Sequence, residues 1–398
     1  MRTLVLITLS FPYGGITEAS FIEPEIAALS GSFERVIIAP SIMQSDPLQI
    51  NLPPNVFVSD DLLLPAGILP RLRGLASEGA SYVKAVMSGC NPVREISHNA
   101  YIGMTVEGLR KLIRNHSIDI SDTLFYTFWF DFQTAALSEI PNAKFISRAH
   151  GYDIYEDGRG YISRYWRKRT LSKMQALYPV CDYSVNYLKT LYPDFGSKIS
   201  TRRLGSLQPL GLNPLGDSKG IVCFGCARLS PEKGVIRQVE LLMQYASANP
   251  HTNVIYHHIG GGELMPELLC LKEKAPDNLE IIVHGAVPNA EVHAFMASTH
   301  IDFTLLLSES EGLPISICES LSYGIPVIAT GICGIPETVA EGGGITLPSE
   351  TRLDDLAEAV STILSNPQKF REEARLNWER NFSSQTLRQN FAKEISGL

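Results

Sequence analysis

Two cations, Arg228 and Lys233, stand five residues apart in a segment that turns at Ser230-Pro231. The segment follows an apolar run that is typical of a buried strand, and it precedes a helical pattern. Cations at the carboxyl edge of a parallel sheet, close to the N-terminus of a helix, suit a diphosphate group. These residues therefore indicate either a diphosphate site or a solvated loop that carries two surface cations.

Glu311 precedes a helix predicted over residues 313–323, and Glu319 lies within its first two turns. Gly312 permits close backbone approach, and Pro314 suits the first helical position. Glu319 falls among apolar neighbours, where a carboxylate needs a partner. A ribose diol offers two hydroxyl donors to one carboxylate, and the helix N-terminus offers free N–H groups to a phosphate. The alternative is a glutamate on a half-exposed helix.

Two further motifs follow predicted strands of the first half. His150 comes directly after the strand predicted at 144–147, where its ring could face a cleft, although a lone histidine is more often structural. Gly14 and Gly15 follow the strand predicted at 4–9. A glycine pair lets backbone amides approach an anion or a sugar, and a plain turn is the alternative.

Strands and helices must position these residues, and their pattern is regular. Short apolar runs predict strands at residues 4–9, 36–39, 124–128 and 144–147, and again at 221–224, 254–259, 279–283, 303–307 and 327–329. Amphipathic stretches predict helices at 20–29, 105–115, 235–246, 313–323 and 382–395. Because strands alternate with helices in two sets, the sequence predicts an α/β fold with two doubly wound parallel sheets.

The length of 398 residues suits two domains of about 200 residues each. Residues 205–216 are punctuated by Gly and Pro and lack periodicity, as an interdomain linker does. We therefore predict a first domain over 1–205, a linker over 206–218 and a second domain over 219–381.

The formal net charge is −8, which argues against a nucleic-acid-binding protein. The charge is divided unevenly along the chain. Residues 1–210 contain 21 Lys and Arg against 19 Asp and Glu, whereas residues 211–398 contain 13 against 23. The acidic excess therefore belongs to the second half, whereas the nearly neutral first half holds the basic cluster, where we expect any membrane surface to lie.

The seven cysteines are scattered, which favours a reducing compartment over a disulfide framework. Cys223 and Cys226 fall inside an apolar run, so we interpret them as buried strand residues and not as a metal site. No run of 18 apolar residues predicts a spanning helix. The apolar N-terminus is interpreted as a first buried strand and not as a signal peptide.

Two segments could touch a membrane. Residues 61–114 have a helical composition interrupted by prolines, and they could form either a membrane-touching hairpin or ordinary packed helices. Residues 159–173 interleave Arg and Lys with Tyr and Trp. That helix could rest on anionic lipid or meet a lipid-diphosphate acceptor, or it could be a solvated face with extended cations.

Together these motifs resemble retaining glycosyltransferases of family 4, which have the GT-B fold. The resemblance is carried by Arg228 and Lys233, by the Glu311 and Glu319 pair, by Gly334-Ile335-Pro336-Glu337 and by His150-Gly151 with Asp153. It is strongest over residues 219–345. The stretch 148–155 resembles bacterial enzymes that build O-antigen (lipopolysaccharide), capsule or exopolysaccharide. Cys333 stands where the family often has glycine, which leaves the specificity for the sugar open.

The resemblance implies two Rossmann-like domains facing a central cleft, with the C-terminal residues 382–398 crossing back to the first domain. It implies that Arg228 and Lys233 neutralise the donor diphosphate in place of a metal ion, with the amides of Gly312 and Leu313 nearby. Glu319 would bind the ribose, Glu311 the transferred sugar, and His284 and Val287 would flank the base. In the first domain, His150 would face the sugar, and Gly14 and Gly15 would lie near the acceptor or a phosphate.

The function that the resemblance implies is the transfer of a hexose from a nucleotide sugar to a lipid-linked oligosaccharide, with retention and with no metal or other cofactor. The acceptor would be attacked on the front face of the donor sugar. Uridine is the first expectation for the nucleotide and guanosine the second. The location expected is the cytoplasm or the inner face of the cell membrane. A nucleotide-sugar epimerase or sugar synthase, and a non-catalytic nucleotide-sugar-binding subunit, are the alternatives.

Overall fold

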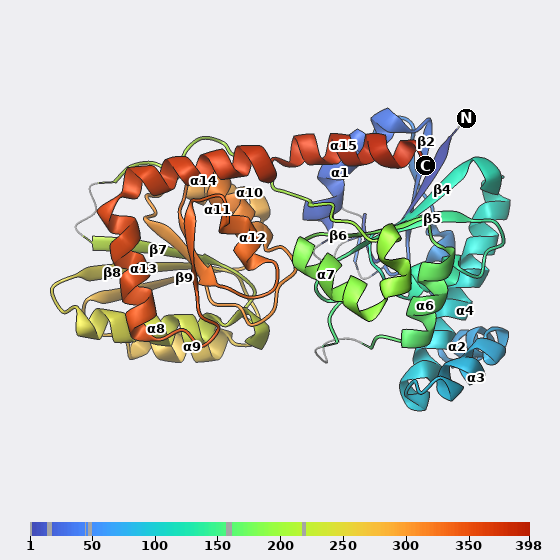
Figure 1. Cartoon of the computed structure of the whole chain (residues 1–398), viewed down its shortest axis with the longest axis horizontal. Helices are drawn as coiled ribbons and strands as arrows, with labels where there is room; N and C mark the ends of the chain where they lie inside the picture. Colours follow the sequence, from blue (N-terminus) through green and yellow to red (C-terminus); the bar gives the residue numbers. More distant parts are fainter. Residues whose placement is uncertain (1, 14–17, 44, 47–49, 157–160, 217–219) are drawn as a thin grey trace. The chain divides into compact units, whose positions relative to one another are not determined.

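The computed structural model of the chain describes residues 2–13, 18–43, 45–46, 50–156, 161–216 and 220–398 (Figure 1). It divides into two compact units. Unit 1 comprises Met1–Arg203 and Arg388–Leu398, and unit 2 comprises Leu204–Leu387. Helix α15 (Ser384–Ser396) begins in unit 2 and continues in unit 1. Residues 205–216, where a linker is expected, fall inside unit 2.

Unit 1 is built on one parallel sheet with the strand order β3-β2-β1-β4-β5-β6. Its strands are β1 (Thr3–Thr8), β2 (Arg35–Pro40), β3 (Val56–Val58), β4 (Thr123–Thr127), β5 (Lys144–Ala149) and β6 (Ala176–Pro179). The central strands are buried along nearly their whole length. A parallel sheet needs this continuous apolar sequence because helices cover both of its faces.

The helices of unit 1 are α1 (Ala19–Ser32), α2 (Ile68–Ser77), α3 (Gly79–Met87), α4 (Pro92–Asn115), α5 (Phe132–Leu137), α6 (Arg164–Lys173) and α7 (Asp182–Leu191). Asn91 begins the long α4 because its side-chain oxygen accepts hydrogen bonds from the N–H groups of Val93 at 3.0 Å and Arg94 at 3.1 Å. Gly103 lets α2 and α4 touch, since a Cβ there would lie 2.1 Å from the carbonyl oxygen of Gly74.

A fully buried ion pair joins the elements of unit 1. Arg148 of β5 donates to Glu25 of α1 at 3.2 Å and to the hydroxyl of Tyr126 at 2.8 Å. Its guanidinium lies 3.9 Å from the ring centre of Phe391 in α15. The pair is compensated by hydrogen bonds on both partners, which is what a buried charge requires. Arg148 is therefore a structural residue, although it immediately precedes the His150 motif.

Unit 2 repeats the same architecture, with the strand order β12-β11-β10-β7-β8-β9. Its strands are β7 (Gly220–Cys226), β8 (Asn253–Ile259), β9 (Leu279–Gly285), β10 (Phe303–Leu306), β11 (Val327–Thr330) and β12 (Gly344–Leu347). Cys223 and Cys226 lie in β7, as predicted. Cys223 and Phe224 belong to different apolar clusters, because successive strand residues point to opposite faces of the sheet.

The helices of unit 2 are α8 (Val235–Ala248), α9 (Met265–Glu273), α10 (Asn289–Ser298), α11 (Ile315–Ser322), α12 (Ile335–Val339), α13 (Leu353–Ser365) and α14 (Pro367–Asn381). Figure 1 shows α8 and α9 side by side on one face of the sheet, with α10 and α11 on the other. Layers on both faces complete the doubly wound arrangement.

In both units the first and fourth strands are neighbours, and the chain leaves them in opposite directions. These neighbours are β1 and β4 in unit 1, and β7 and β10 in unit 2. Ligands of open α/β sheets bind beyond the carboxyl ends of the strands at such a switch point. The loops after these four strands are therefore the first places to examine for function.

The structure confirms the predicted α/β fold and all nine predicted strands, and it adds β3, β6 and β12. The helix predicted at 105–115 is only the second half of α4, which begins at Pro92. Helix α11 begins at Ile315, so Pro314 is its N-cap and not its first residue. Among the described residues, no helix is both long and apolar enough to span a membrane.

Candidate functional site

The loop after β7 carries Lys233 at the end of a single 3₁₀ turn, Pro231–Lys233. Gly234 follows with φ +62°, and a Cβ at that position would lie 2.0 Å from the carbonyl oxygen of Leu307. Only glycine tolerates both this conformation and this contact. The turn is therefore pressed against the end of β10, which fixes the Lys233 backbone at the switch point.

Lys233 and Glu311 form an ion pair across this switch point. The Nζ–Oε1 distance is 2.6 Å, and their side chains are 21% and 8% exposed. The Ser308 hydroxyl donates to the same Oε1 atom at 2.9 Å. Two residues that are 78 positions apart in sequence, one predicted for the diphosphate and the other for the transferred sugar, are thus brought together.

Arg228 lies on the same loop in a different environment. Its side chain is 68% exposed, and it donates to Glu232 at 3.0 Å. An exposed pair of this kind contributes little to stability, because water screens it. The structure therefore places Arg228 near the switch point but does not join its guanidinium to Lys233 or to Glu311.

Glu319 lies in the second turn of α11 and is 9% exposed. Its Oε1 atom accepts a hydrogen bond from Asn289 at 3.1 Å and lies 3.5 Å from Nε2 of His293. His293 in turn shares a hydrogen bond of 3.0 Å with the hydroxyl of Tyr323. The predicted partner for this buried carboxylate is thus supplied in part by α10, at a position that sequence reasoning missed.

Gly312 and Leu313 directly precede the N-terminus of α11. The Leu313 side chain is buried, so the group that it can offer a ligand is its backbone N–H. The first N–H groups of a helix lack partners within the helix, and they attract anions. This position fits the predicted contribution of the two amides to a phosphate site.

His284, near the end of β9, forms part of an aromatic surface. Its ring stacks on that of His257 at 5.3 Å, the two share a hydrogen bond of 3.1 Å, and both contact Phe295. Burial and the neighbouring His284 lower the pKa of His257 to about 4, and burial lowers that of His284. Val287 packs against the apolar cluster that contains Phe224. This surface is uncharged near neutral pH, which suits stacking of a base.

In unit 1, Gly14 and Gly15 lie outside the described residues, but the residues on both sides of them are fixed. Glu18, at the start of α1, is fully buried. It accepts hydrogen bonds from the N–H groups of Leu9 at 2.9 Å, Ser10 at 2.5 Å and Phe11 at 2.9 Å, and from the indole of Trp129. One carboxylate thus ties the loop after β1 to the loop after β4.

Trp129, which is held by Glu18, packs against the ring of His150. The two rings lie 4.6 Å apart, and Phe128 contacts the imidazole from another direction at 4.8 Å. Nε2 of His150 lies 3.1 Å from the carbonyl oxygen of Phe128, which can only accept, so Nε2 carries the proton. Burial and the charge of Arg148 lower the pKa of His150 to about 3. The imidazole of His150 is therefore neutral near neutral pH, and its Nδ1 atom can accept a hydrogen bond.

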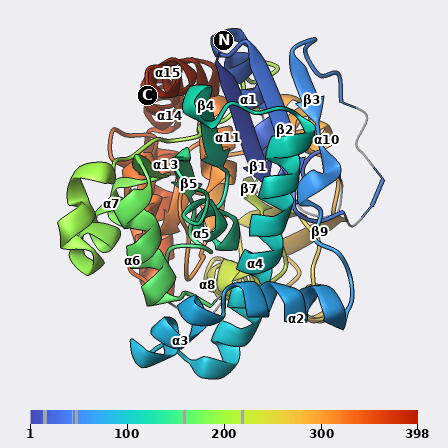
Figure 2. The same cartoon turned by 90° about the vertical axis from the view of Figure 1, so that its right-hand side faces the viewer.

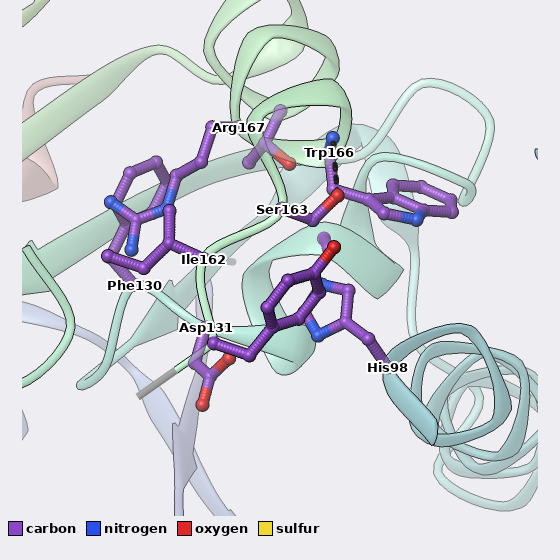
Figure 3. A pocket seen from close by; sticks show the side chains of 10 residues that line it. His98, Phe130, Asp131, Ile162, Ser163, Trp166 and Arg167 are labelled. Carbon is purple, nitrogen blue, oxygen red and sulfur yellow. Dashed lines mark hydrogen bonds between the residues drawn. The ribbon is translucent and has the colours of Figure 1, made fainter. Parts of the chain in front are cut away.

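Asp153 fixes the loop that carries His150. Its carboxylate accepts hydrogen bonds from the N–H groups of His150 at 2.5 Å and Phe130 at 2.7 Å. The buried Arg167 donates to the carbonyl oxygen of Asp153 and lies 4.3 Å from the ring centre of Phe130. Figure 3 shows Arg167 and Asp131 in a pocket that is also lined by His98 and Ser163.

Cys333 has a backbone φ of +46°, in the left-handed region that favours glycine. It lies in the turn between β11 and α12. This conformation gives a physical reason why glycine is common at that position in the family that the sequence resembles.

Of the described site residues that the sequence singled out, most lie in loops that follow strands, whereas His284 lies within β9 and Glu319 in the second turn of α11. Sequence reasoning missed Glu18, Ser308 and Asn289, which orient the other groups. Only Glu18 carried a signal, since it follows the glycine pair closely at the start of a helix. Across the described parts of the chain, no group of three or more His, Cys, Asp or Glu residues is arranged to hold a metal ion.

Comparison with known proteins gives these sites a context. Residues 214–381 match the family model described as glycosyl transferases group 1. GDP-mannose-dependent alpha-(1-6)-phosphatidylinositol monomannoside mannosyltransferase of Mycolicibacterium smegmatis is 27% identical over 161 residues, covering 39% of this chain and 41% of that protein. O-antigen biosynthesis glycosyltransferase WbnH of Escherichia coli is 30% identical over 138 residues, covering 35% and 37%. The chain therefore spans less than half the length of either relative.

Similarity to solved structures extends over the whole chain. Sucrose-phosphate synthase from Thermosynechococcus elongatus aligns with a TM-score of 0.72 at 14% identity, covering 100% of this chain and 99% of that one. Together with the two doubly wound sheets, this likeness confirms the predicted GT-B fold.

Replacing Glu18 tests its organising role. Because at least four donors point at the carboxylate, Glu18→Gln should lower the free energy of unfolding by about 1–3 kcal/mol, measured by urea denaturation. Glu23→Gln, on the exposed side of the same helix, is the control and should change it by less than about 0.5 kcal/mol. Equal effects in the two variants would contradict the assignment.

The neutral histidines make stability depend on pH. Burial lowers the pKa values of His150 to about 3 and of His258 to about 4. Between pH 4 and about 6.5 each of these histidines therefore binds more protons in the unfolded chain than in the folded chain, so the stability that the neutral rings contribute should fall as the solution is acidified. Asp153, whose pKa burial raises to about 7, contributes with the opposite sign. Urea unfolding at several pH values measures this slope.

In the same experiment, His150→Gln keeps a donor for the Phe128 carbonyl but removes one titrating ring. The slope should then decrease by about one proton. His251→Gln, at an exposed position, should leave it unchanged. An unaltered slope in His150→Gln would show that this ring is protonated equally in both states.

Proposed function

We propose that this chain is a retaining glycosyltransferase that moves a hexose from a nucleotide sugar to a lipid-linked glycan acceptor, in the biosynthesis of a cell-surface polysaccharide such as O-antigen, capsule or exopolysaccharide. The observation that carries the proposal is the Lys233–Glu311 pair, which lies at the switch point of the region that matches the group 1 family model. The assignment to family 4 is part of the proposal, and it is supported by the resemblance of the chain's motifs to that group.

The donor would bind to unit 2, with its diphosphate at Lys233. An ammonium group has three donors, so Lys233 can keep its bond to Glu311 and still contact two phosphate oxygens. Arg228 is 68% exposed and donates to Glu232 on the same loop, so its guanidinium can turn toward the same phosphates. The amides of Gly312 and Leu313 would complete this site at the start of α11.

Glu311 and Glu319 would accept hydrogen bonds from hydroxyl groups of the donor. Oε1 of Glu311 is occupied by Lys233 and Ser308, and Oε1 of Glu319 by Asn289. The second oxygen of each carboxylate is the atom that we assign to the substrate: a sugar hydroxyl for Glu311 and the ribose diol for Glu319. His284 and Val287 would line the base, with His257 beneath the imidazole of His284.

The chemistry follows from the charges. The bond between the anomeric carbon and the diphosphate oxygen breaks, and its electron pair goes to the diphosphate. Fixed cations stabilise that oxygen in the transition state, which removes the need for a metal ion. The acceptor oxygen bonds to the anomeric carbon on the same face, and its proton goes to the leaving phosphate.

His150 and the Gly14-Gly15 loop would serve the sugar and acceptor side of the reaction. A neutral imidazole cannot stabilise an anion by charge, but Nδ1 can accept a hydrogen bond from a sugar hydroxyl. We assign His150 this orienting role. Asp153 and Trp129 hold the ring in the position that it requires.

Substitutions in the donor site should separate these roles. Lys233→Ala should lower kcat/KM by about 10²–10³-fold, because it removes a charge that stabilises the leaving group. Glu319→Ala should mainly raise the KM for the donor, by about tenfold. Release of nucleoside diphosphate measures both effects, with the exposed Lys369→Ala as the control. Full activity in both site variants would refute the assignment.

A thermal-shift panel of nucleotide sugars should identify the donor. A ligand at 100 times its Kd stabilises the folded state by about 2.7 kcal/mol, which raises the unfolding midpoint. We expect uridine diphosphate sugars to give the largest shift and guanosine diphosphate sugars the next. Glu319→Ala should reduce the shift. A shift without turnover on any acceptor would favour a binding subunit, and a sugar product without an acceptor would favour an epimerase or a synthase.

A further inference from the structure

Two helices of unit 1 present apolar side chains to water. In α2, Ile68, Leu69 and Leu72 are 72%, 56% and 54% exposed, and in α3, Val83 and Met87 are 52% and 82% exposed. A surface helix of a globular protein normally turns its apolar stripe toward the core. Contiguous exposed apolar groups mark a binding surface.

The packing of α2 explains this orientation. Gly74 faces α4, since a Cβ there would lie 2.4 Å from the carbonyl oxygen of Ala100. At about 100° per residue, Ile68 and Leu72 fall on the opposite side of the helix. The small residue thus makes the buried contact and the large apolar ones point outward.

Helix α3 has the same arrangement. Its buried residue is Ala85, and the exposed Val83 and Met87 stand two positions before and after it. Two positions correspond to about 200° around the helix, so both side chains lie opposite the packed face. Both α2 and α3 therefore bury a small residue and expose large apolar side chains on the opposite side.

Within residues 62–94, the exposed charged side chains have one sign. Residues 62–94 contain four cations, Arg71, Arg73, Lys84 and Arg94, and a single acidic residue, Glu78. Glu78 is only 8% exposed, so its carboxylate does not belong to the outer surface. Arg71 and Arg73 stand next to Leu72 in sequence, one on each side of the apolar stripe of α2.

Figures 1 and 2 show α2 and α3 next to each other at one end of unit 1, and both pack on α4. The start of α4 extends the exposed region with Val93, which is 75% exposed. We call this region the α2–α3 surface; it consists of Ile68, Leu69, Leu72, Val83, Met87 and Val93 with Arg71, Arg73, Lys84 and Arg94.

We propose that the α2–α3 surface docks on an anionic phospholipid bilayer. The apolar side chains would enter the boundary between headgroups and acyl chains, and the cations would meet lipid phosphates. A second copy of the chain would bring two sets of four cations face to face, so charge complementarity favours the bilayer. The proposal deepens the proposed function, because it presents unit 1 to a lipid-linked acceptor.

Helix α6, the other candidate for membrane contact, is organised differently. Arg164 pairs with Glu156 at 2.6 Å, and Arg169 with Glu139 at 2.6 Å. Trp166 and Arg167 are buried. These four residues of α6 therefore make contacts within unit 1, whereas the side chains of the α2–α3 surface are exposed.

Sedimentation of the full chain with vesicles tests the proposal. Binding should be strong with phosphatidylcholine vesicles that contain phosphatidylglycerol and weak with pure phosphatidylcholine. Arg71→Gln with Arg73→Gln should weaken binding about thirtyfold, the change expected for two basic residues near the membrane. Leu69→Ser with Leu72→Ser should weaken it about tenfold or more.

Leu269→Ser with Leu376→Ser is the matched control, because these leucines of unit 2 are 44% and 46% exposed. It should bind vesicles like the unchanged chain. Equal binding to both vesicle types, or unaltered binding in the α2–α3 variants, would overturn the proposal. Self-association in analytical ultracentrifugation that the Leu69/Leu72 variant abolishes would identify a second copy as the occupant instead. Vesicle binding is measured without a nucleotide sugar. A failure of the membrane proposal can therefore be distinguished from a failure of the glycosyltransferase proposal.

Discussion

The direction of the chain at two neighbouring strands is the constraint on which both candidate sites depend. In each unit the first and fourth strands are adjacent and parallel, and their connections leave on opposite sides. The loops after them therefore end at the same edge with no helix between them. Polar groups from distant parts of the sequence meet there: Glu18 with Trp129 in unit 1, and Lys233 with Glu311 in unit 2.

Three buried carboxylates show how surroundings decide between structure and function. Glu25 and its partner Arg148 are both essentially inaccessible and fully hydrogen-bonded, so that pair can only stabilise the fold. Glu18 is satisfied by backbone N–H groups, and it fixes a loop without offering a charge to solvent. Glu311 pairs with a lysine that keeps 21% of its side chain exposed. Only this last pair leaves a cation able to meet a ligand.

The sequence was sufficient where one local pattern determines structure, and insufficient where partners lie far apart. Every strand with four or more buried residues was predicted, whereas the strands that were missed have fewer: one in β3, three in β6 and one in β12. The residue types of Lys233 and Glu319 indicated a site. Asn289 and Trp129 could not be found, because only the folded sheet brings them to Glu319 and Glu18. In the basic segment 159–173, Arg164 and Arg169 form ion pairs within unit 1.

The match to the family model covers unit 2 residues and stops short of unit 1, and the proposed chemistry gives a reason for this division. Uridine and guanosine diphosphate sugars all carry a diphosphate and a ribose, so the cation and carboxylates that bind them can stay the same from one enzyme to another. Acceptors and membranes differ in shape and charge. The surface that meets them must change with them, and it can do so on α2 and α3 without disturbing the sheet, because small residues such as Gly74 make the contact with α4. The exposed positions opposite Gly74 are then free to be apolar or polar according to the surface that they touch.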